Sequence, residues 1–171
     1  MKTALLIIDV QNFFINKWTQ QVPKNIVRLI EGGEFAKIIF TKFVNTADSN
    51  FVKQFNYTGC AKPPYSDIVK DLEPWVKKDN VFTKNTYSAF LQPADSAGKP
   101  GLAEFLKKNR LEEITVVGID TENCVLTNAR ELFDRGYKVK VISEGCASST
   151  GGPAQHEAAL KIIKNNIGQV I

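Results

Sequence analysis

The chain has 171 residues, of which 43% are hydrophobic and 23% charged, a balance typical of one globular domain with a core large enough to fold alone. Its 22 Lys and Arg against 18 Asp and Glu give a net charge of +4. These basic residues are scattered, whereas nucleic-acid binders gather them on one face or tail. No apolar run reaches the roughly 20 residues that span a bilayer, and Asp9 ends the first apolar run too early for a secretory signal. We therefore expect a single cytoplasmic domain over residues 1–171, with neither nucleic-acid nor membrane partners.

The cysteine pattern fits a reducing compartment. The three cysteines, Cys60, Cys124 and Cys146, are odd in number, widely spaced and form no CxxC pair. Such a set provides no disulfide framework. Cys60 falls in a predicted loop and Cys146 follows a predicted strand, with no motif around either of them.

Short apolar runs alternate with amphipathic segments along the whole chain. In chain order the pattern predicts a strand at 3–8, a helix at 23–30, a strand at 36–43, an irregular loop at 45–64, a weak helix at 65–72, a short strand at 80–84, a helix at 101–108, a strand at 113–119, a helix at 121–135, a strand at 137–142, a helix at 153–165 and a short strand at 169–171. The near-continuous apolar strands are typical of a sheet covered on both faces. We therefore expect an α/β fold of three layers, α/β/α and Rossmann-like, with a mainly parallel sheet of five or six strands.

In open α/β sheets, ligands bind beyond the carboxyl ends of the strands. Asp9, Lys84 and Cys124 stand at or just after three such ends. Each also has a structural interpretation: a turn or cap aspartate, a solvated loop lysine and a buried structural cysteine. Thr121 is a good N-cap and would place Cys124 at the third helical position, where the helix dipole favours a thiolate.

Three segments in this order resemble the isochorismatase-like cysteine hydrolase superfamily, whose members include nicotinamidases and N-carbamoylsarcosine amidohydrolases. The segments are ALLIIDVQNFF at 4–14, KNTYSAF at 84–90 and GIDTENCVLTNA at 118–129. The resemblance runs over nearly the whole chain and implies an isochorismatase-like fold. It also implies an assembly of identical subunits, a dimer or a tetramer.

The resemblance also implies roles for single residues. Cys124 would be the nucleophile, Asp9 the general base and acid, and Lys84 the cation that holds the thiolate and keeps Asp9 ionised. The backbone N–H groups of Asp120 and Cys124 would form the oxyanion hole. A non-proline cis peptide at Ile119–Asp120 would aim the first of these groups.

The chain departs from its relatives in two ways that concern the reaction. Nicotinamidases carry an Asp-x-His metal site after the second strand, but residues 41–50 contain no histidine, and Asp48 is interpreted as a loop residue. We therefore expect no metal and no other cofactor. Isochorismatases proper lack the cysteine nucleophile, so Cys124 argues against vinyl-ether cleavage. His156, the single histidine, is expected to secure the start of the last helix rather than to serve a Cys–His mechanism.

The aromatic residues Phe14, Phe43, Tyr87 and Phe90 are candidate walls of the substrate pocket, together with Asn123 beside the nucleophile. Core packing is the alternative for each ring and is at least as favoured for Phe43 and Phe90. The Asp120 side chain has two open interpretations, in the pocket or towards solvent.

The leading hypothesis is an amidohydrolase that cleaves a C–N bond of a small amide or carbamoyl substrate through a covalent acyl-enzyme on Cys124. Two hypotheses from other classes compete with it. One is a non-catalytic protein that uses the fold for binding or assembly, which the presence of all three candidate catalytic residues disfavours. The other is a redox thiol protein, for which the sequence offers no resolving cysteine close to Cys124.

Overall fold

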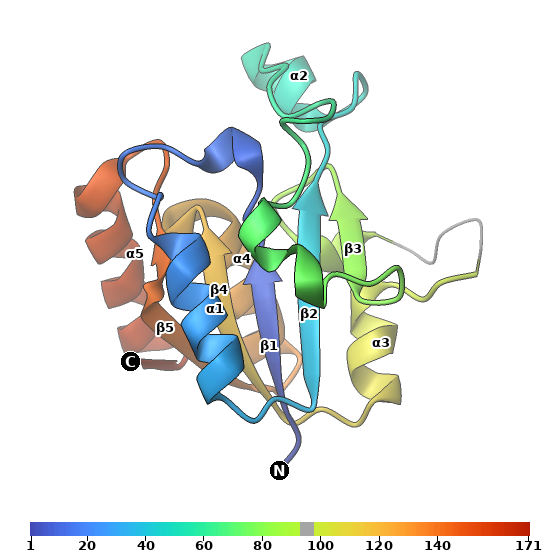
Figure 1. Ribbon diagram of the computed structural model, residues 1–171, viewed down its shortest axis with the longest axis vertical. Helices are drawn as coiled ribbons and strands as arrows, with labels where there is room; N and C mark the ends of the chain where they lie inside the picture. The colour runs from blue at the N-terminus through green and yellow to red at the C-terminus, as the bar shows by residue number, and fades with distance from the viewer. Residues whose placement is uncertain (93–97) are drawn as a thin grey trace.

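The computed structural model describes residues 1–92 and 98–171 and contains one six-stranded sheet (Figure 1). The strand order is β3-β2-β1-β4-β5-β6, and every neighbouring pair is parallel. The strands are β1 (Thr3–Ile8), β2 (Lys37–Phe43), β3 (Val81–Lys84), β4 (Glu113–Ile119), β5 (Lys138–Ala147) and β6 (Gln169–Val170). The predicted parallel α/β fold is therefore confirmed.

Helices cover both faces of this sheet. They are α1 (Val22–Gly32), α2 (Asn50–Phe55), α3 (Leu102–Lys108), α4 (Leu126–Asp134) and α5 (Gly152–Asn166). In Figure 1, α1 lies in front of the strands and α3 and α4 lie behind them, and α5 packs against α4 and β5. Because both faces are covered, the central strands are largely apolar and almost fully buried: β1 buries five of its six residues and β4 buries all seven.

The chain changes direction across the sheet beside β1. The strands that follow β1 in sequence, β2 and β3, lie on one side of it, whereas β4, β5 and β6 lie on the other. Such a reversal opens a crevice at the carboxyl ends of the two strands that flank it, and ligands of open α/β sheets bind there. The candidate site follows from this topology. Within the described ranges, no helix is long and apolar enough to cross a membrane.

The segment between β2 and β3 differs from the predictions. The helix predicted at 65–72 is wrong, because the backbone there bonds to the chain that follows β1: Asn12 N–H donates to Asp67 O, and Val69 N–H donates to Val10 O. A 3-10 helix at Lys70–Trp75 follows instead. The predicted irregular loop at 45–64 contains α2, which Ser49 caps through its side chain. A helix of six residues is too short to produce a recognisable apolar period.

Candidate active site

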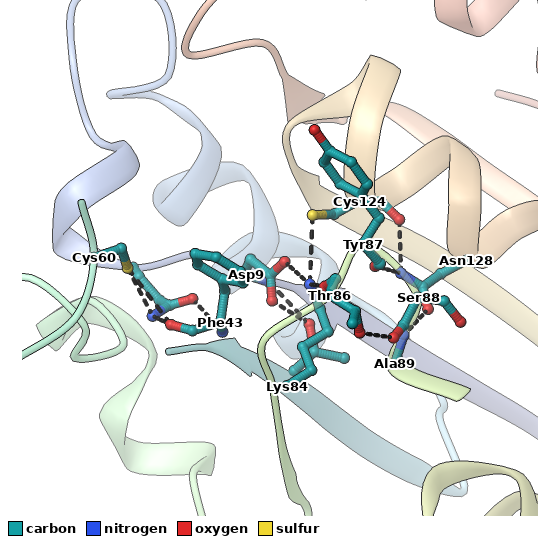
Figure 2. Close-up of polar contacts among 12 residues, drawn as sticks. Asp9, Phe43, Cys60, Lys84, Thr86, Tyr87, Ser88, Ala89, Cys124 and Asn128 are labelled. Atoms are coloured by element: carbon teal, nitrogen blue, oxygen red, sulfur yellow. Dashed lines mark hydrogen bonds and ion pairs between the residues drawn. The ribbon is translucent and has the colours of Figure 1, made fainter. Parts of the chain in front are cut away.

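The structure brings Asp9, Lys84 and Cys124 into contact at the carboxyl edge of the sheet (Figure 2). Asp9 directly follows β1, Lys84 is the last residue of β3, and Cys124 lies in the turn after β4. The Lys84 ammonium Nζ is 2.6 Å from Asp9 Oδ2 and 3.4 Å from Cys124 Sγ. An acid, an amine and a thiol from three distant parts of the chain thus share one small volume.

The neighbouring strand fixes the Asp9 carboxylate. The Thr41 hydroxyl of β2 accepts a hydrogen bond from the Asp9 N–H at 3.1 Å and donates one to Asp9 Oδ1 at 2.6 Å. Asp9 is fully buried and has a backbone φ of 50°, which turns the chain sharply after β1. One carboxylate oxygen is therefore held by Thr41, while Oδ2 faces the Lys84 ammonium.

Lys84 is a buried cation whose contacts favour its charge. Its side chain is fully buried, and Nζ also donates to Thr86 O at 2.9 Å. Burial by itself would lower the pKa of Lys84, but the adjacent Asp9 and Cys124 outweigh that effect and raise it. Lys84 therefore stays protonated, and its charge is matched by the Asp9 carboxylate.

Burial opposes the thiolate that the position of Cys124 was expected to favour. Burial raises the pKa of Cys124; Lys84 lowers it, but Asp9 raises it and burial prevails. The thiol therefore needs a base at the moment it attacks. Asp9, whose hydrogen bond with Cys124 contributes to that raised pKa, is the group placed to accept the proton.

The turn that carries Cys124 also differs from its prediction. The helix expected at 121–135 begins with a π-helical turn, Thr121–Val125, before α4, and the N-cap is Asp120 rather than Thr121. The Thr121 hydroxyl lies 2.8 Å from His156 Nδ1, so it contacts α5 instead of capping its own helix. Half-buried His156, whose pKa is lowered by burial, thereby ties the beginning of α5 to the turn.

Asn128, which the sequence reasoning missed, holds the Cys124 turn against the Lys84 loop. Its Nδ2 donates to Cys124 O at 2.7 Å and to Tyr87 O at 3.0 Å, and its Oδ1 accepts from Ala89 N–H at 2.9 Å. The side chain is fully buried. A usable signal existed, because Asn128 lies beside Ala129 and Leu132 on the buried face of α4, where a polar group requires partners.

Gln11, which the sequence reasoning also missed, holds the segment after β1 against the end of β2. Its Nε2 donates to Phe43 O and Ser66 O, both at 2.7 Å, and its Oε1 accepts from Phe43 N–H at 2.7 Å. The segment after β1 is therefore bonded to the end of β2 and to the chain beyond α2. Gln11 fixes the backbone of Phe43, and the ring of Phe43 borders the cavity described next.

A cavity of about 300 Å³ opens above the thiol, a volume suited to a small ligand. Its walls combine aromatic rings with a few polar groups, supplied by Phe14, Phe43, Phe51, Phe55, Tyr57, Tyr87, Ile119, Asp120, Asn123, Cys124 and Thr150. The expected wall residues Phe14, Phe43, Tyr87 and Asn123 are among them. Phe90 is not, and that expectation is wrong: Phe90 packs on the core, with the Arg135 guanidinium 4.5 Å from its ring.

Phe51, Phe55 and Tyr57 line the cavity without having been expected there. They come from α2 and the residues after it, which stand above the carboxyl ends of the strands in Figure 1. The Phe51 ring joins the predicted wall edge to face: the ring centroids of Phe43 and Phe51 are 5.1 Å apart, and those of Phe51 and Tyr87 are 4.8 Å apart. Sequence reasoning left these residues in an irregular loop, where no period assigns a side chain to the cavity.

Asp120 is one of the residues that line the cavity, and it is buried rather than directed to solvent. The Ile119–Asp120 peptide bond is cis, and Asp120 Oδ1 accepts a hydrogen bond from Ser149 N–H at 2.5 Å. Only 7% of the residue is exposed. Burial raises the pKa of Asp120, although hydrogen bonds with Ser149 and Asn123 oppose the shift.

The residues at this site do not match the donor set of a transition metal. Within the two described ranges, no three His, Cys, Asp or Glu side chains gather to hold an ion. His156, the single histidine, contacts Thr121, and Asp48 is an exposed turn residue between β2 and α2. The chemistry proposed below therefore uses no metal.

Comparison with known proteins places these motifs in one family. Residues 3–171 match the family model of the isochorismatase domain. Nicotinamidase 3 of Arabidopsis thaliana is 29% identical over 164 residues, which cover 92% of this chain and 78% of the relative. A probable inactive nicotinamidase of the same plant is 25% identical, over 95% of this chain and 88% of its own. The crystal structure of a nicotinamidase from Bacillus subtilis has the same fold, with a TM-score of 0.81 at 24% identity over 99% of each chain.

Proposed function

The chain belongs to the isochorismatase family, and we propose that it is a cysteine hydrolase that cleaves a C–N bond of a small amide or carbamoyl compound. The observation that carries this proposal is the position of the Lys84 ammonium, between the Asp9 carboxylate at 2.6 Å and the Cys124 thiol at 3.4 Å. These three groups lie below a cavity that Cys124 itself lines. A thiol, a base and a cation at the bottom of a small pocket are the components of nucleophilic acyl transfer.

In the first half of the proposed reaction, Asp9 accepts the thiol proton while Cys124 Sγ attacks the amide carbonyl carbon. A bond forms between sulfur and carbon, and the carbonyl oxygen takes up the negative charge. We assign the stabilisation of that oxygen to the backbone N–H groups of Asp120 and Cys124. When the intermediate collapses, the C–N bond breaks, and Asp9 gives its proton to the departing nitrogen.

The second half restores the enzyme. Water attacks the thioester carbon and loses a proton to Asp9, the S–C bond breaks, and that proton returns to Cys124. The Lys84 ammonium keeps its proton throughout, and its charge stabilises whichever of Asp9 and Cys124 is negative. The raised pKa of Lys84 supports this assignment, because a cation that does not give up its proton is required in both halves.

Relatives carry the name nicotinamidase, but we propose a metal-independent enzyme for which nicotinamide is a poor substrate. The segment from Thr41 to Gly59 contains no histidine or cysteine that would anchor a metal beside a pyridine ring. Orientation of the substrate is a large part of rate enhancement. The aromatic wall suits a small, partly apolar acyl group instead.

Ammonia release over a panel of small amides tests the proposal. We expect turnover by the wild-type protein, none above background by Cys124→Ala, and unchanged turnover by Cys146→Ala, a matched variant that removes a buried thiol of β5 outside the cavity lining. Release that survives Cys124→Ala would contradict the mechanism. Absence of release from every amide would favour a non-catalytic binding protein.

Two further features stay predictions. We propose that the enzyme acts in the cytoplasm, where its three free cysteines remain reduced. We also propose a homo-oligomer, a dimer or a tetramer. Light scattering after size-exclusion chromatography measures the molar mass directly, and a mass equal to the 19.0 kDa of one chain would contradict the second prediction.

A further inference from the structure

The cavity above Cys124 has an uneven charge. Six of its lining residues are aromatic, and among the lining residues that the structure describes Asp120 is the one Asp, Glu, Lys or Arg. Asp120 is more than nine-tenths buried and makes no ion pair in that part of the chain. A buried carboxylate without a counter-ion is unfavourable in the empty protein. A cation that binds beside this carboxylate removes the unfavourable free energy of the unpaired charge.

The nearest cation of the site does not supply that counter-charge. The Lys84 ammonium points to Asp9, Cys124 and the carbonyl of Thr86, so it is already matched by Asp9. A second acid, Glu122, lies two residues beyond Asp120. Its carboxylate Oε1 accepts from Ser148 Oγ at 2.6 Å and from Thr150 Oγ1 at 3.1 Å. Neither partner is charged, so Glu122, which is not a lining residue, offers Asp120 no counter-charge and adds a second acid near it.

The aromatic wall favours the same ligand charge by an independent effect. Rings of Phe43, Phe51 and Tyr87 pack edge to face around the cavity. The face of an aromatic ring is electron-rich and attracts a cation within about 6 Å, whereas it repels an anion. A carboxylate and several aromatic rings around one cavity are surroundings that an ammonium or related cationic nitrogen prefers.

The Asp120 carboxylate is also held at a fixed place relative to the nucleophile. It belongs to the residue before the Cys124 turn, and Ser149 N–H anchors its Oδ1. An anchored charge discriminates between ligands more sharply than a mobile one, because it does not move away from an unfavourable group.

From these contacts we propose that Asp120 is the specificity-determining residue of the site, and that it selects amides whose acyl part carries a cationic nitrogen and rejects those that carry a carboxylate. The inference rests on the proposed amidohydrolase function and names its substrate class. No covalent step beyond the reaction already described is required.

Amides of similar size whose far ends are cationic, neutral or anionic test the inference. One set is β-alaninamide, butyramide and succinamate, and an aromatic set is 3-(aminomethyl)benzamide, 3-methylbenzamide and 3-carbamoylbenzoate. For the wild-type protein we expect kcat/KM to be about 10-fold to 100-fold higher for the cationic member than for the neutral one, with the anionic member lowest. The difference should lie mainly in KM.

The decisive variant is Asp120→Asn, which keeps an acceptor for Ser149 N–H but removes the charge. We expect the preference for the cationic amide in kcat/KM to fall about tenfold or more. We also expect kcat/KM for the anionic amide to rise. Asp48→Asn is the control, because it removes the same charge from an exposed turn at the same end of the sheet without touching the cavity lining. Asp120→Ser is the substitute if Asp120→Asn fails to fold.

The outcomes separate the inference from the function on which it rests. Turnover with equal kcat/KM across a set, or a preference that Asp120→Asn leaves intact, would overturn the role of Asp120 and leave the hydrolase standing. If no amide is hydrolysed, the proposed function fails, and calorimetric binding of the same amides to Cys124→Ala decides about Asp120. Tighter binding of the cation that Asp120→Asn abolishes would support the inference, and equal binding would overturn it.

Discussion

The floor and the wall of the cavity are built in different ways. The floor consists of Asp9, Lys84 and Cys124, which the ends of three strands of one sheet hold in place, and Lys84 is only 2% exposed. Part of the wall, Phe51 and Phe55, comes from the short helix α2, and Phe55 is 69% exposed. The difference teaches that the proposed catalytic groups are fixed by the core of the fold, whereas the part of the aromatic wall that α2 supplies lies on a surface segment that can change without disturbing the core.

Removing the cation from the floor is expected to have the largest effect. Lys84→Met leaves the fully buried Asp9 carboxylate without its counter-ion, which destabilises a protein by about 3–5 kcal/mol. Turnover should also be lost. Urea unfolding measures the first effect and ammonia release the second.

The double variant Asp9→Asn with Lys84→Met sharpens this prediction. It removes both charges, so most of the stability should return while turnover stays absent. If Lys84→Met alone is as stable as the wild type, the buried ion pair is not important for folding. The raised pKa of Lys84 gives the sign of the pH dependence: the stabilisation is fully present below the ordinary pKa of 10.5 and is lost as pH rises through the higher folded value.

Asp9→Asn alone should lower kcat by about 10²–10⁴ as the lost contribution of a general base. The amide oxygen still accepts the hydrogen bond from Thr41, but the buried Lys84 ammonium loses its counter-ion, so we expect the same fold at a stability lowered by about 3–5 kcal/mol. Circular dichroism and steady-state kinetics check the two parts. Near-normal turnover would exclude Asp9 as the base.

Changes in the wall should affect binding rather than the chemical step. Phe51→Ala removes a ring that contacts Phe43 and Tyr87 in the cavity, and we expect KM to rise about tenfold, with kcat changed by less. Phe90→Ala is the control, because Phe90 packs on the core beside Arg135 and should lower stability without raising KM. A raised KM in Phe90→Ala with an unchanged KM in Phe51→Ala would show that Phe90 lines the cavity and Phe51 does not.

The smallest expected effect concerns stability at Asp120. Burial raises the pKa of this carboxyl group above its ordinary value of 3.8. An acid of this kind favours folding below pH 3.8, and the contribution is lost as pH rises through the folded pKa. Asp120→Asn should therefore be more stable than the wild type at pH 7, by about 1 kcal/mol, with the gain shrinking in acid. Thermal melts at several pH values measure it, and a less stable variant at pH 7 would refute the prediction.

The sequence predicted the features that depend on neighbouring residues and missed those that depend on residues far apart in the chain. The strands and the positions of Asp9, Lys84 and Cys124 follow from local apolar periods and one topological rule. The raised pKa of Cys124 does not follow from local sequence, because it depends on burial by segments distant in sequence. The wall formed by α2 was missed because six residues show no usable period.

Phe90 illustrates the same limit from the other side. An aromatic residue near a motif can face the cavity or the core, and only tertiary packing decides between them. Phe90 and Tyr87 are three residues apart, yet Tyr87 borders the cavity and Phe90 packs on the core. Asn128 was identifiable in principle, as a polar residue on the buried face of a helix, but its partners in the Lys84 loop were not.

The central claim is that Cys124 forms a covalent acyl intermediate in the floor of the cavity. Acid-quenched mass spectrometry during turnover of the best amide, followed by peptide mapping, tests it most directly. We predict an acyl adduct on the peptide that contains Cys124, sensitive to hydroxylamine as a thioester should be, and none in Cys124→Ala. Turnover with an adduct on Cys60 or Cys146, or turnover that persists in Cys124→Ala, would contradict the claim.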